Sequence, residues 1–413
     1  MSNAATATID AAAQVIVVGG GPVGLLAAIA LADGGVRTTL VARRAPYGDN
    51  RTTALLAGSL NALRALDVWR RCEAQAAPIS TIRIIDDRSG LLKAPEIGFE
   101  SAEIDLPAFG HNIENHVLMA ALEARVAELG NLQRIDATAA DVTVSDAVTV
   151  HTTDGQMVAG ALVVGADGRN SLCRRAAGID IQTQPYDQVA ITLTFRHARP
   201  HRGISTEFHT DHGPFTMVPL PGNRSSLVWV MRAEDAERIA GLQPDALNRE
   251  IERHSHSILG KVEVEPKLST FPLTLQTASP LAARRIALVG EAAHVLPPIG
   301  AQGLNLGFRD AAAIADCAIQ AVNAGNDPGS DDVMDGYNAS RQFDVRSRSV
   351  AVDLLNRSLL TDFLPVQGAR GLGLYLSGKV GPLRRALMRE GVAPRAHEPP
   401  LMGATLPTRP PPV

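Results

Sequence analysis

The sequence predicts an α/β fold in which a Rossmann-like nucleotide-binding domain contains an inserted, mostly antiparallel β domain. Three observations predict it. An apolar strand pattern at 14–18 passes through a glycine-rich turn into a helical pattern at 22–33, the opening of a βαβ unit. From 187 to 271 the pattern changes to alternating strands separated by Gly-Pro and Pro-Gly turns, which is typical of an antiparallel sheet. A buried strand pattern returns at 285–289 and an alanine-rich helix is predicted at 302–324, so the first domain resumes after the second.

The remaining elements follow in chain order. We expect strands at 37–41, 80–86, 142–150, 157–164, 189–195, 204–208, 215–220 and 225–230, and helices at 59–66, 113–129 and 337–360. Asp154-Gly155 is a common hairpin turn. These elements predict a discontinuous nucleotide-binding domain at 12–76, 105–186 and 280–340, a β domain at 77–104 and 187–279, and a C-terminal helical region at 341–400. We expect the ends, 1–11 and 401–413, to be disordered.

Composition excludes several functions. The 413 residues carry 39 Lys and Arg against 43 Asp and Glu, a net charge of -4, so no strong positive field is present to hold nucleic acid. Aromatic residues make up only 4%, so surfaces for base stacking are also scarce. The three cysteines, at 72, 173 and 317, lack paired spacing and predict neither a disulfide framework nor a zinc site. The start has no signal-peptide pattern, and we expect a cytoplasmic protein.

The first chemical signal is Gly19-x-Gly21-x-x-Gly24. It lies within an uncharged run, 15–32, that is long enough for a membrane span, but its glycines and Pro22 favour a strand, a turn and a new helix instead. In this context the first glycine makes the turn, the second lets a pyrophosphate approach the backbone, and the helix N-terminus supplies free amides. The motif predicts a bound dinucleotide without saying which one.

The end of the second strand is unusual for such a site. An acid that binds the adenosine ribose is expected there, but the sequence has Ala42 followed by Arg43 and Arg44. The two arginines are consistent with reading the 2′-phosphate of NADP, which makes a dehydrogenase the competing interpretation. They are equally consistent with solvated side chains at the end of a strand.

Two later segments end parallel strands with an acid. Asp167-Gly168 follows the strand at 157–164, and Gly290-Glu291 follows the strand at 285–289. Ligands of open α/β sheets bind at such carboxyl ends. The second segment leads into the glycine-rich stretch 297–305 at the start of a helix, which suits an anionic or electron-rich ring edge.

With these three motifs in order, the chain resembles the class A FAD-dependent aromatic monooxygenases of the p-hydroxybenzoate hydroxylase fold. Within that group it is most similar to the aromatic-ring hydroxylases of ubiquinone biosynthesis. The likeness extends from about 14 to 392 and includes Arg51 in 49–55, Glu114-Asn115, the segment 212–220 with Trp229, and a run that ends at Asp310.

The resemblance implies FAD as the cofactor, with NAD(P)H as a transient co-substrate and O₂ as the oxidant that hydroxylates a hydrophobic phenol. Cofactor contacts carried over by the resemblance are Gly19, Gly21, Gly24, Arg43, Arg51, Asp167, Gly168, Gly290, Glu291, Pro298, Gly300, Gln302, Gly303, Leu304 and Asn305. Two positions depart from the pattern. Ala42 replaces the ribose-binding acid, and Glu291 stands where Asp is commoner.

The substrate pocket is expected between the flavin and the inserted sheet. Its predicted wall residues are His212, Phe215, Met217 and Pro297. His209, Asp211 and His212 resemble a metal cluster by residue type only, and we expect no metal because alternation along a strand separates neighbouring side chains.

Three hypotheses stay open at this stage. His294 is a candidate to deprotonate the phenol, with a histidine at the edge of the core as the alternative. The stretch 360–387, which mixes apolar and basic residues, predicts either peripheral contact with the inner face of the membrane or a helix packed on the protein. The chain is either a prenylphenol hydroxylase of ubiquinone biosynthesis, a hydroxylase of another phenol, or a non-catalytic flavin-binding subunit of a biosynthetic complex.

Overall fold

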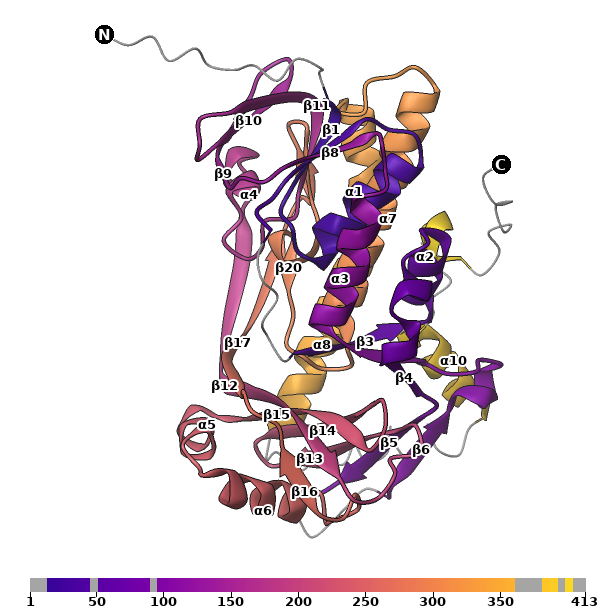
Figure 1. The fold of residues 1–413 in the computed structure, drawn as a ribbon, viewed down its shortest axis with the longest axis vertical. Helices are drawn as coiled ribbons and strands as arrows, with labels where there is room; N and C mark the ends of the chain where they lie inside the picture. The colour runs from indigo at the N-terminus through magenta and orange to yellow at the C-terminus, as the bar shows by residue number, and fades with distance from the viewer. Residues whose placement is uncertain (1–12, 45–50, 90–94, 361–380, 393–397, 404–413) are drawn as a thin grey trace.

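The computed structural model describes residues 13–44, 51–89, 95–360, 381–392 and 398–403. Its two main sheets form the upper and lower parts of the molecule, and long strands and one long helix join them (Figure 1). The upper part is built from both ends of the chain, and the lower part mainly from the middle. The predicted insertion of a β domain into an α/β domain is therefore confirmed.

The upper sheet has a parallel core in the order β19-β11-β1-β2-β8. Its strands are β1 (Ala13–Val18), β2 (Thr38–Val41), β8 (Leu132–Ile135), β9 (Ala139–Val144), β10 (Val148–Thr152), β11 (Met157–Gly165), β18 (Ala282–Ala283) and β19 (Ile286–Leu288). Helices α1 (Pro22–Asp33), α3 (Asn115–Val126) and α7 (Gln302–Asn323) lie side by side against it (Figure 1). The hairpin predicted at Asp154-Gly155 joins β10 to β11. Helix α1 is buried along nearly its whole length, which explains why the uncharged run looked like a membrane span.

The lower sheet has the order β20-β17-β12-β15-β14-β13-β5-β6. Its strands are β5 (Thr81–Asp86), β6 (Ile97–Glu100), β12 (Ile181–His197), β13 (Ile204–Thr210), β14 (Gly213–Leu220), β15 (Arg224–Arg232), β16 (Val262–Val264), β17 (Ser269–Ala278) and β20 (His294–Val295). The four strands predicted between 189 and 230 are present. Two helices that we had not anticipated, α5 (Ala233–Ala240) and α6 (Pro244–His254), cover one face of this sheet through an apolar core.

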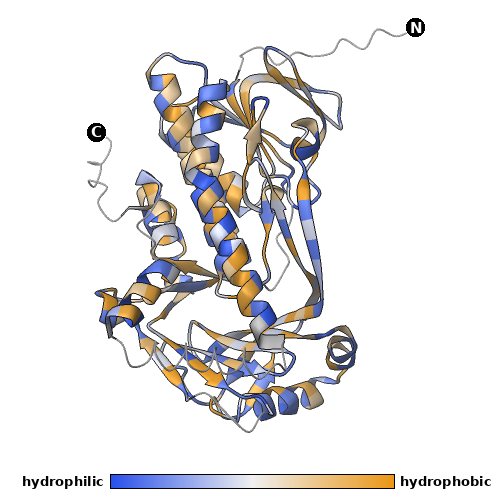
Figure 2. Ribbon diagram, turned by 180° about the vertical axis from the view of Figure 1, so that it is seen from behind, coloured by the Kyte–Doolittle hydropathy of each residue, from blue (hydrophilic) through white to orange (hydrophobic). Residues whose placement is uncertain are grey.

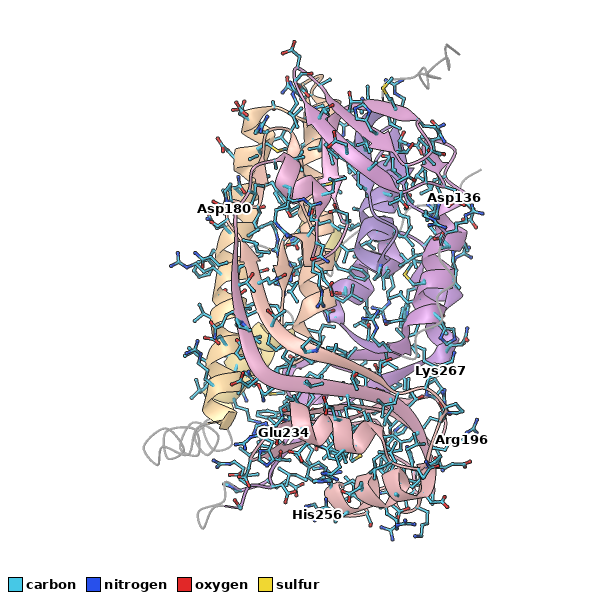
Figure 3. All side chains as sticks on the ribbon, turned by 90° about the vertical axis from the view of Figure 1, so that its left-hand side faces the viewer. Asp136, Asp180, Arg196, Glu234, His256 and Lys267 are labelled. Atoms are coloured by element: carbon cyan, nitrogen blue, oxygen red, sulfur yellow. The ribbon has the colours of Figure 1, made fainter. Side chains whose placement is uncertain are left out.

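Two strands connect the upper and lower parts. Strand β12 pairs with β17 from Ile181 onward. Residues 181–186, which the sequence analysis assigned to the nucleotide-binding domain, therefore belong to this connecting pair of strands. Figure 3 shows Asp180, just ahead of β12, beside the upper part, and Arg196, near its other end, at the far side of the lower sheet. Continuous strands therefore connect the two sheets.

The helix predicted at 113–129 begins later than expected. Ile113 belongs to β7 (Gly110–Glu114), which pairs with β3 (Thr52–Leu56) and β4 (Ala76–Ile79) in a small third sheet. Alternation at this position is masked by the apolar run of the helix that follows at once, so periodicity alone merged the two elements. Shorter helices are α2 (Ala57–Ala65), α4 (Leu172–Ala176), η1 (Trp69–Arg71), η2 (Glu73–Gln75), η3 (Ser101–Ile104), η4 (Gly290–Ala292) and η5 (Pro400–Met402).

The C-terminal helices run along both parts. Helix α8 (Asp331–Leu360), seen from behind in Figure 2, carries hydrophilic and hydrophobic residues and extends from the upper part to the lower sheet. Helix α10 (Gly381–Val392) packs near η3 and the edge of the lower sheet. Much of the stretch 360–387 lies outside the described residues. No helix in the described ranges combines the length and the apolar character that a membrane crossing requires.

We expect the attachment of α10 to weaken in acid. Arg384 donates two hydrogen bonds, both 2.6 Å, to the Glu103 carboxylate, and this pairing lowers the pKa of Glu103 to about 2. Because folding lowers this pKa, the contact stabilises the protein above the unfolded value and is lost as the pH falls from about 4.5 toward 2. Proteolysis of α10 at pH 3 should therefore rise relative to pH 7. Glu103→Gln should show the raised proteolysis already at pH 7, and an unchanged rate in that variant would contradict the prediction.

Candidate cofactor and active site

The glycine fingerprint lies at the carboxyl end of β1, against the end of β11. Gly19 has φ +117°, and a Cβ built there would lie 2.2 Å from the Ala166 carbonyl oxygen, so only glycine fits. A Cβ on Gly24 would lie 2.1 Å from the Gly19 oxygen. Two of the three predicted glycines are therefore required by the protein itself.

Gly21 behaves differently. It is the N-cap of α1. A Cβ built on it would point into open space, with no protein atom within 4 Å. No side chain caps the helix here, so the amides of the first turn are available. A glycine that the protein does not require, at an uncapped helix N-terminus, fits a pyrophosphate that approaches the backbone.

The other motifs converge on the same place. Val23 in the first turn of α1 packs against two glycines of later motifs, because a Cβ on Gly290 or on Gly307 would lie 3.1 Å or 2.8 Å from its side chain. Gly303 also faces open space, with no atom within 4 Å of a built Cβ. The structure thus brings the fingerprint, the Gly290-Glu291 turn and the start of α7 together, as their positions at strand ends predicted.

The two motif acids have different surroundings. Asp167 accepts hydrogen bonds from Ser171 Oγ at 2.6 Å and from the Cys173 amide at 3.0 Å, so its carboxylate shapes the turn into α4. Glu291 lies in η4 with 55% of its side chain exposed, and its Oε2 is 3.7 Å from Arg169 Nε. A contact of either acid with the cofactor stays a prediction.

The second strand ends as the sequence indicated, with buried Ala42 followed by exposed Arg43 and Arg44. Sequence reasoning missed the acid that lies nearby. Asp136 follows β8, the neighbouring strand, and accepts a hydrogen bond from the Arg44 amide at 2.8 Å. Strand β8 was not among the strands predicted from the sequence, so no strand end pointed to this carboxylate. Arg134, on β8, donates to the Ala42 carbonyl oxygen at 3.2 Å.

The loop at 297–305 turns sharply into α7. Gly300 has φ +64° and Ala301, the N-cap, has φ 55°. The Gln302 side chain donates to the Gly300 carbonyl oxygen at 2.9 Å and accepts from Arg348 Nη1 of α8 at 2.7 Å. Pro297 is buried in this loop, while Pro298 and Leu304 are partly exposed. Arg51 lies directly ahead of β3, and its carbonyl oxygen accepts a hydrogen bond from the Asn115 amide at 2.9 Å.

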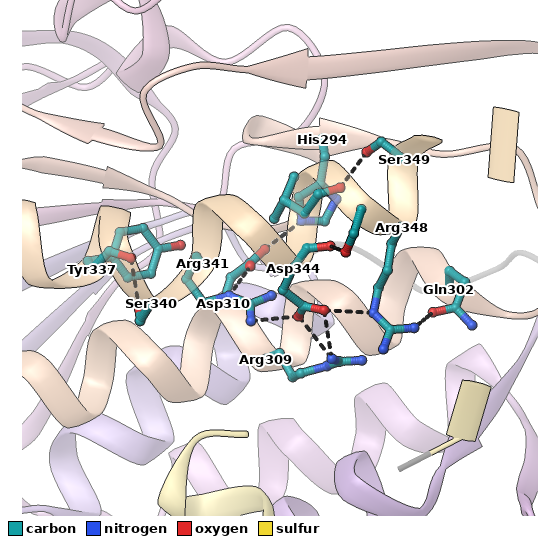
Figure 4. Close-up of polar contacts among 12 residues, drawn as sticks. His294, Gln302, Arg309, Asp310, Tyr337, Ser340, Arg341, Asp344, Arg348 and Ser349 are labelled. Atoms are coloured by element: carbon teal, nitrogen blue, oxygen red, sulfur yellow. Dashed lines mark hydrogen bonds and ion pairs between the residues drawn. The ribbon is translucent and has the colours of Figure 1, made fainter. Parts of the chain in front are cut away.

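A buried charge network lies beneath this loop (Figure 4). Asp310 of α7 accepts hydrogen bonds from Arg341 Nε at 2.9 Å and from His294 Nε2 at 2.6 Å. Asp344 of α8 is paired with Arg341, with Arg309 and with Arg348. Arg348 also holds Gln302, so the network connects α8 to the cofactor loop.

His294 is therefore surrounded by protein. Its side chain is 1% exposed, its Nε2 is engaged by Asp310, and its Nδ1 has no hydrogen-bond partner in the described part of the chain. Neither ring nitrogen is accessible in this conformation. This geometry favours the structural alternative over direct contact with a substrate.

Asn305 clamps the cofactor loop to the third sheet. Its Oδ1 accepts from the Leu56 amide at 2.9 Å and from Ser59 Oγ at 2.6 Å, and its Nδ2 donates to the Ala54 and Ala301 carbonyl oxygens at 2.8 Å and 2.6 Å. With its hydrogen-bonding groups occupied by protein, Asn305 supports the loop from behind.

Asn305→Ala should lower the free energy of unfolding by about 2–3 kcal/mol, because it leaves a buried amide and carbonyl groups unpaired. Urea denaturation with and without FAD measures this loss. Asn323→Ala, at the exposed end of the same helix, is the matched control and should change it by less than about 0.5 kcal/mol. Equal stabilities of the two variants would contradict the clamp.

Two of the residues predicted to form the wall of the substrate pocket lie on the other face of the lower sheet. Phe215 and Met217 lie in the apolar core with Ile239 of α5 and Ile251 of α6, and so point away from the upper part. Because alternate residues of a strand face opposite sides, Thr216 and its neighbours at i±2 face the upper part instead. His212 is exposed at the turn before β14. The described residues contain no group of three potential metal ligands.

Comparison with known proteins identifies the family. The FAD binding domain family model matches residues 12–348, most of the chain. The chain belongs to this FAD-binding family. It is 37% identical over 409 residues to ubiquinone hydroxylase UbiL of Rhodospirillum rubrum, covering 96% of this chain and 93% of that protein. It is 29% identical over 386 residues to 3-demethoxyubiquinol 3-hydroxylase of Escherichia coli, covering 91% and 97%.

A solved structure agrees on the fold. The crystal structure of p-nitrophenol 4-monooxygenase PnpA from Pseudomonas putida DLL-E4 superposes with a TM-score of 0.76 at 19% identity, covering 93% of this chain and 99% of PnpA. The resemblance drawn from the three motifs is confirmed, and this member of the FAD-binding family is an FAD-dependent monooxygenase.

Proposed function

We propose that the protein hydroxylates the aromatic ring of a prenylated phenol in ubiquinone biosynthesis, with NAD(P)H and O₂ as co-substrates. The observation that carries the proposal is the match to UbiL, which extends over nearly the whole of both chains and so includes the inserted sheet as well as the FAD domain. The substrate side of such an enzyme is specified by that sheet rather than by the nucleotide fingerprint.

Bound FAD would supply the electron transfer and oxygen chemistry, and the chain would supply binding and orientation. Gly21 and the uncapped start of α1 would hold the pyrophosphate, and the loop at 297–305 would lie along the ring system. The buried side chains beneath that loop would fix its position, since Arg348 and Asn305 hold it from two sides. The sequence contains no second dinucleotide fingerprint, which is consistent with a nicotinamide that visits transiently.

The test begins with purified protein and a gene deletion. We expect a yellow preparation with a flavin absorbance band, NAD(P)H oxidation that rises on addition of a prenylphenol, and a product heavier by one oxygen. The deletion strain should accumulate a quinone precursor that lacks one ring oxygen, identified by mass analysis. A protein that forms no hydroxylated product after it has been loaded with FAD would contradict the proposal.

Two alternatives give different results in the same assays. A hydroxylase of another phenol would consume NAD(P)H with that compound and leave the quinone profile of the deletion strain intact. A flavin-binding accessory subunit would be yellow but would not turn over with any phenol, although its deletion would change the quinone profile.

A catalytic role for His294 is tested by His294→Ala. Its burial beside Asp310 leads us to expect lower stability and lower FAD content. The rate of hydroxylation per bound FAD should change little, measured as product formed per flavin. A loss of that rate with full FAD content would instead support the acid–base hypothesis.

Contact of the C-terminal region with the inner face of the membrane is also a proposal. Leu383 and Leu387, one turn apart on α10, are 43% and 52% exposed, and Arg385 and Arg389 lie on the same helix. Such a surface suits an anionic bilayer, where a prenylated phenol would also partition. Flotation with anionic liposomes should recover the protein, and Leu383→Ser with Leu387→Ser should reduce recovery. A wild-type protein that stays wholly in the soluble fraction would reject membrane contact.

A further inference from the structure

The lower sheet has two chemically different faces. Phe208, Phe215 and Trp229 belong to the face that packs on α5 and α6. The opposite face meets the small third sheet, because Ser226 Oγ accepts a hydrogen bond from Asn112 of β7 at 3.1 Å. Helix α8 reaches the same face, where Asn356 donates to Gln188 at 3.0 Å. Strand register therefore assigns each residue of the sheet to one of these faces.

One row of residues across the second face stays accessible. Strand pairing places the following residues side by side from β12 to β5: Thr192, Val228, Thr216, Glu207 and Ile84. All five are partly exposed, although the sheet is covered on both sides. Their neighbours along the strands that face α5 and α6, such as Phe208 and Phe215, are fully buried. We call these five residues the accessible row.

The accessible row contains a carboxylate that is held in position by the protein. Glu207 Oε1 is 2.7 Å from His209 Nε2, and Oε2 accepts from Thr216 Oγ1 at 3.1 Å. The His209 side chain is 4% exposed, whereas Glu207 keeps 19% of its surface accessible. Burial alone would raise the pKa of Glu207, but the hydrogen bond and the electrostatic attraction from His209, together with the hydrogen bond from Thr216, outweigh burial and lower the pKa. Glu207 is therefore an oriented, ionised acceptor that a ligand can reach.

Two buried polar atoms on this face, one on a member of the row and one beside it, have no hydrogen-bond partner in the described part of the chain. Within the described residues, neither Thr192 Oγ1 nor His209 Nδ1 makes a hydrogen bond, and both atoms are buried. Buried polar atoms are paired in most proteins, so unpaired ones on two strands of one face point to a ligand-binding surface. The apolar members of the row, Val228 and Ile84, suit the faces of an aromatic ring.

The charges around Glu207 do not favour an anion. Beside it, Asp86 and Arg88 form a buried ion pair with 2.7 Å between Nε and Oδ1. The two rows that flank the accessible row on this face contain neither Lys nor Arg. One row consists of Ala190, Val230, Pro214, His209 and Asp86, and the other of Thr194, Ser226, Val218, Ser205 and Ile82. Arg224, one row farther, is paired with Glu114 and Glu265. A neutral group with a hydrogen to donate matches this surface.

We propose that Glu207, held by His209 and Thr216, accepts a hydrogen bond from the ring hydroxyl of the substrate and so selects rings that carry a free hydroxyl group. This inference rests on the proposed function and assigns a substrate-recognition residue to the same site. His209 acts through Glu207 as a positioning residue. No bond is made or broken in this step.

Binding of a phenol and its methyl ether tests the proposal. The probes are 2-geranylphenol and 2-geranylanisole, in which a methyl group replaces the hydroxyl hydrogen, and binding is followed by the change in the flavin absorbance spectrum of the FAD-loaded protein. The wild type should bind the phenol roughly tenfold or more tightly than the ether, since a hydrogen bond to a charged group is replaced by none. Glu207→Gln should reduce that preference to a few-fold at most, with unchanged FAD content.

The control is Glu263→Gln, the same change at an exposed position of β16 in the same sheet, which should keep the wild-type preference. Should Glu207→Gln fail to fold, Thr216→Val removes one of the two bonds that orient the carboxylate and should lower the preference about threefold. A preference unchanged in the folded Glu207→Gln, or in Thr216→Val, overturns the proposal. Failure of the proposed function is distinct: the wild type would then form no hydroxylated product, whatever the binding preference.

Discussion

Gly21→Val is expected to abolish FAD binding and to leave the protein folded. No protein atom lies within 4 Å of a Cβ built on Gly21, and its φ of -72° is open to any residue, so valine meets no obstacle in the protein. A pyrophosphate on the free amides of α1 would, however, meet the new methyl groups at contact distance. We expect the dissociation constant for FAD to rise at least about 100-fold, measured by quenching of flavin fluorescence during reconstitution.

The neighbouring glycines provide the comparison. Gly19→Ala adds a methyl group 2.2 Å from the Ala166 oxygen at a positive φ, and Gly24→Ala places one 2.1 Å from the Gly19 oxygen. Both should destabilise the protein even without FAD, and thermal unfolding of the apoproteins separates them from Gly21→Val. Full FAD content in purified Gly21→Val would refute the assignment of the pyrophosphate to this turn.

The fingerprint was predictable because its chemistry is local. A strand, a turn with a required positive φ and a helix start are all contained in 14–33, and each leaves its mark on the residues themselves. Strands β5, β12, β13, β14 and β15 of the lower sheet were predicted for the same reason, whereas β6, β16, β17 and β20 were not. Convergence of the three motifs also followed, since parallel strands of one sheet end at the same edge.

The sequence analysis did not predict features that depend on contacts with residues far along the chain. Alternation along β14 places Phe215 and Met217 on the same face of the sheet. It does not show which face this is, because both faces are covered and the helices α5 and α6 that pack on it were not predicted. His294 lay beside the motifs in sequence, but Asp310 and its buried charge network decide where its side chain points. Asp136 was missed because it follows β8, a neighbouring strand that was not predicted, and it contacts Arg44 from 92 residues farther along the chain.

Asp310 carries the most consequential of these long-range contacts. Its side chain is fully buried between α7 and α8, where the Arg341 guanidinium is also 0% exposed. Burial alone would raise the pKa of Asp310, but His294 and Arg341 outweigh it and lower the pKa, so the carboxylate is ionised. The Gly290 amide also donates to it, at 3.1 Å, which connects the network to the turn of the Gly290-Glu291 motif.

Asp310→Ala should therefore be the most destabilising single change outside the glycines. Removing one member of a buried ion pair leaves an uncompensated charge and costs about 3–5 kcal/mol, against a total of about 5–15 kcal/mol for a typical protein. Free energies of unfolding from urea denaturation, together with soluble yield, measure the loss. Asp316→Ala, at a partly exposed position of the same helix, should change the free energy by less than about 0.5 kcal/mol.

Asp310→Asn separates charge from shape. Asp310 has three partners, the Gly290 amide, Arg341 Nε and His294 Nε2, and all three donate hydrogen bonds to it. An asparagine side chain has only one acceptor atom, because its other terminal atom is a donor. The Nδ2 of the asparagine would face either Arg341, or else His294 and Gly290, which donate to the same oxygen of Asp310. The imidazole can adapt by moving its proton to Nδ1, but the Gly290 amide cannot. We expect a loss of about 2–3 kcal/mol, between the control and Asp310→Ala, and a wild-type stability would show that the charge of Asp310 is dispensable.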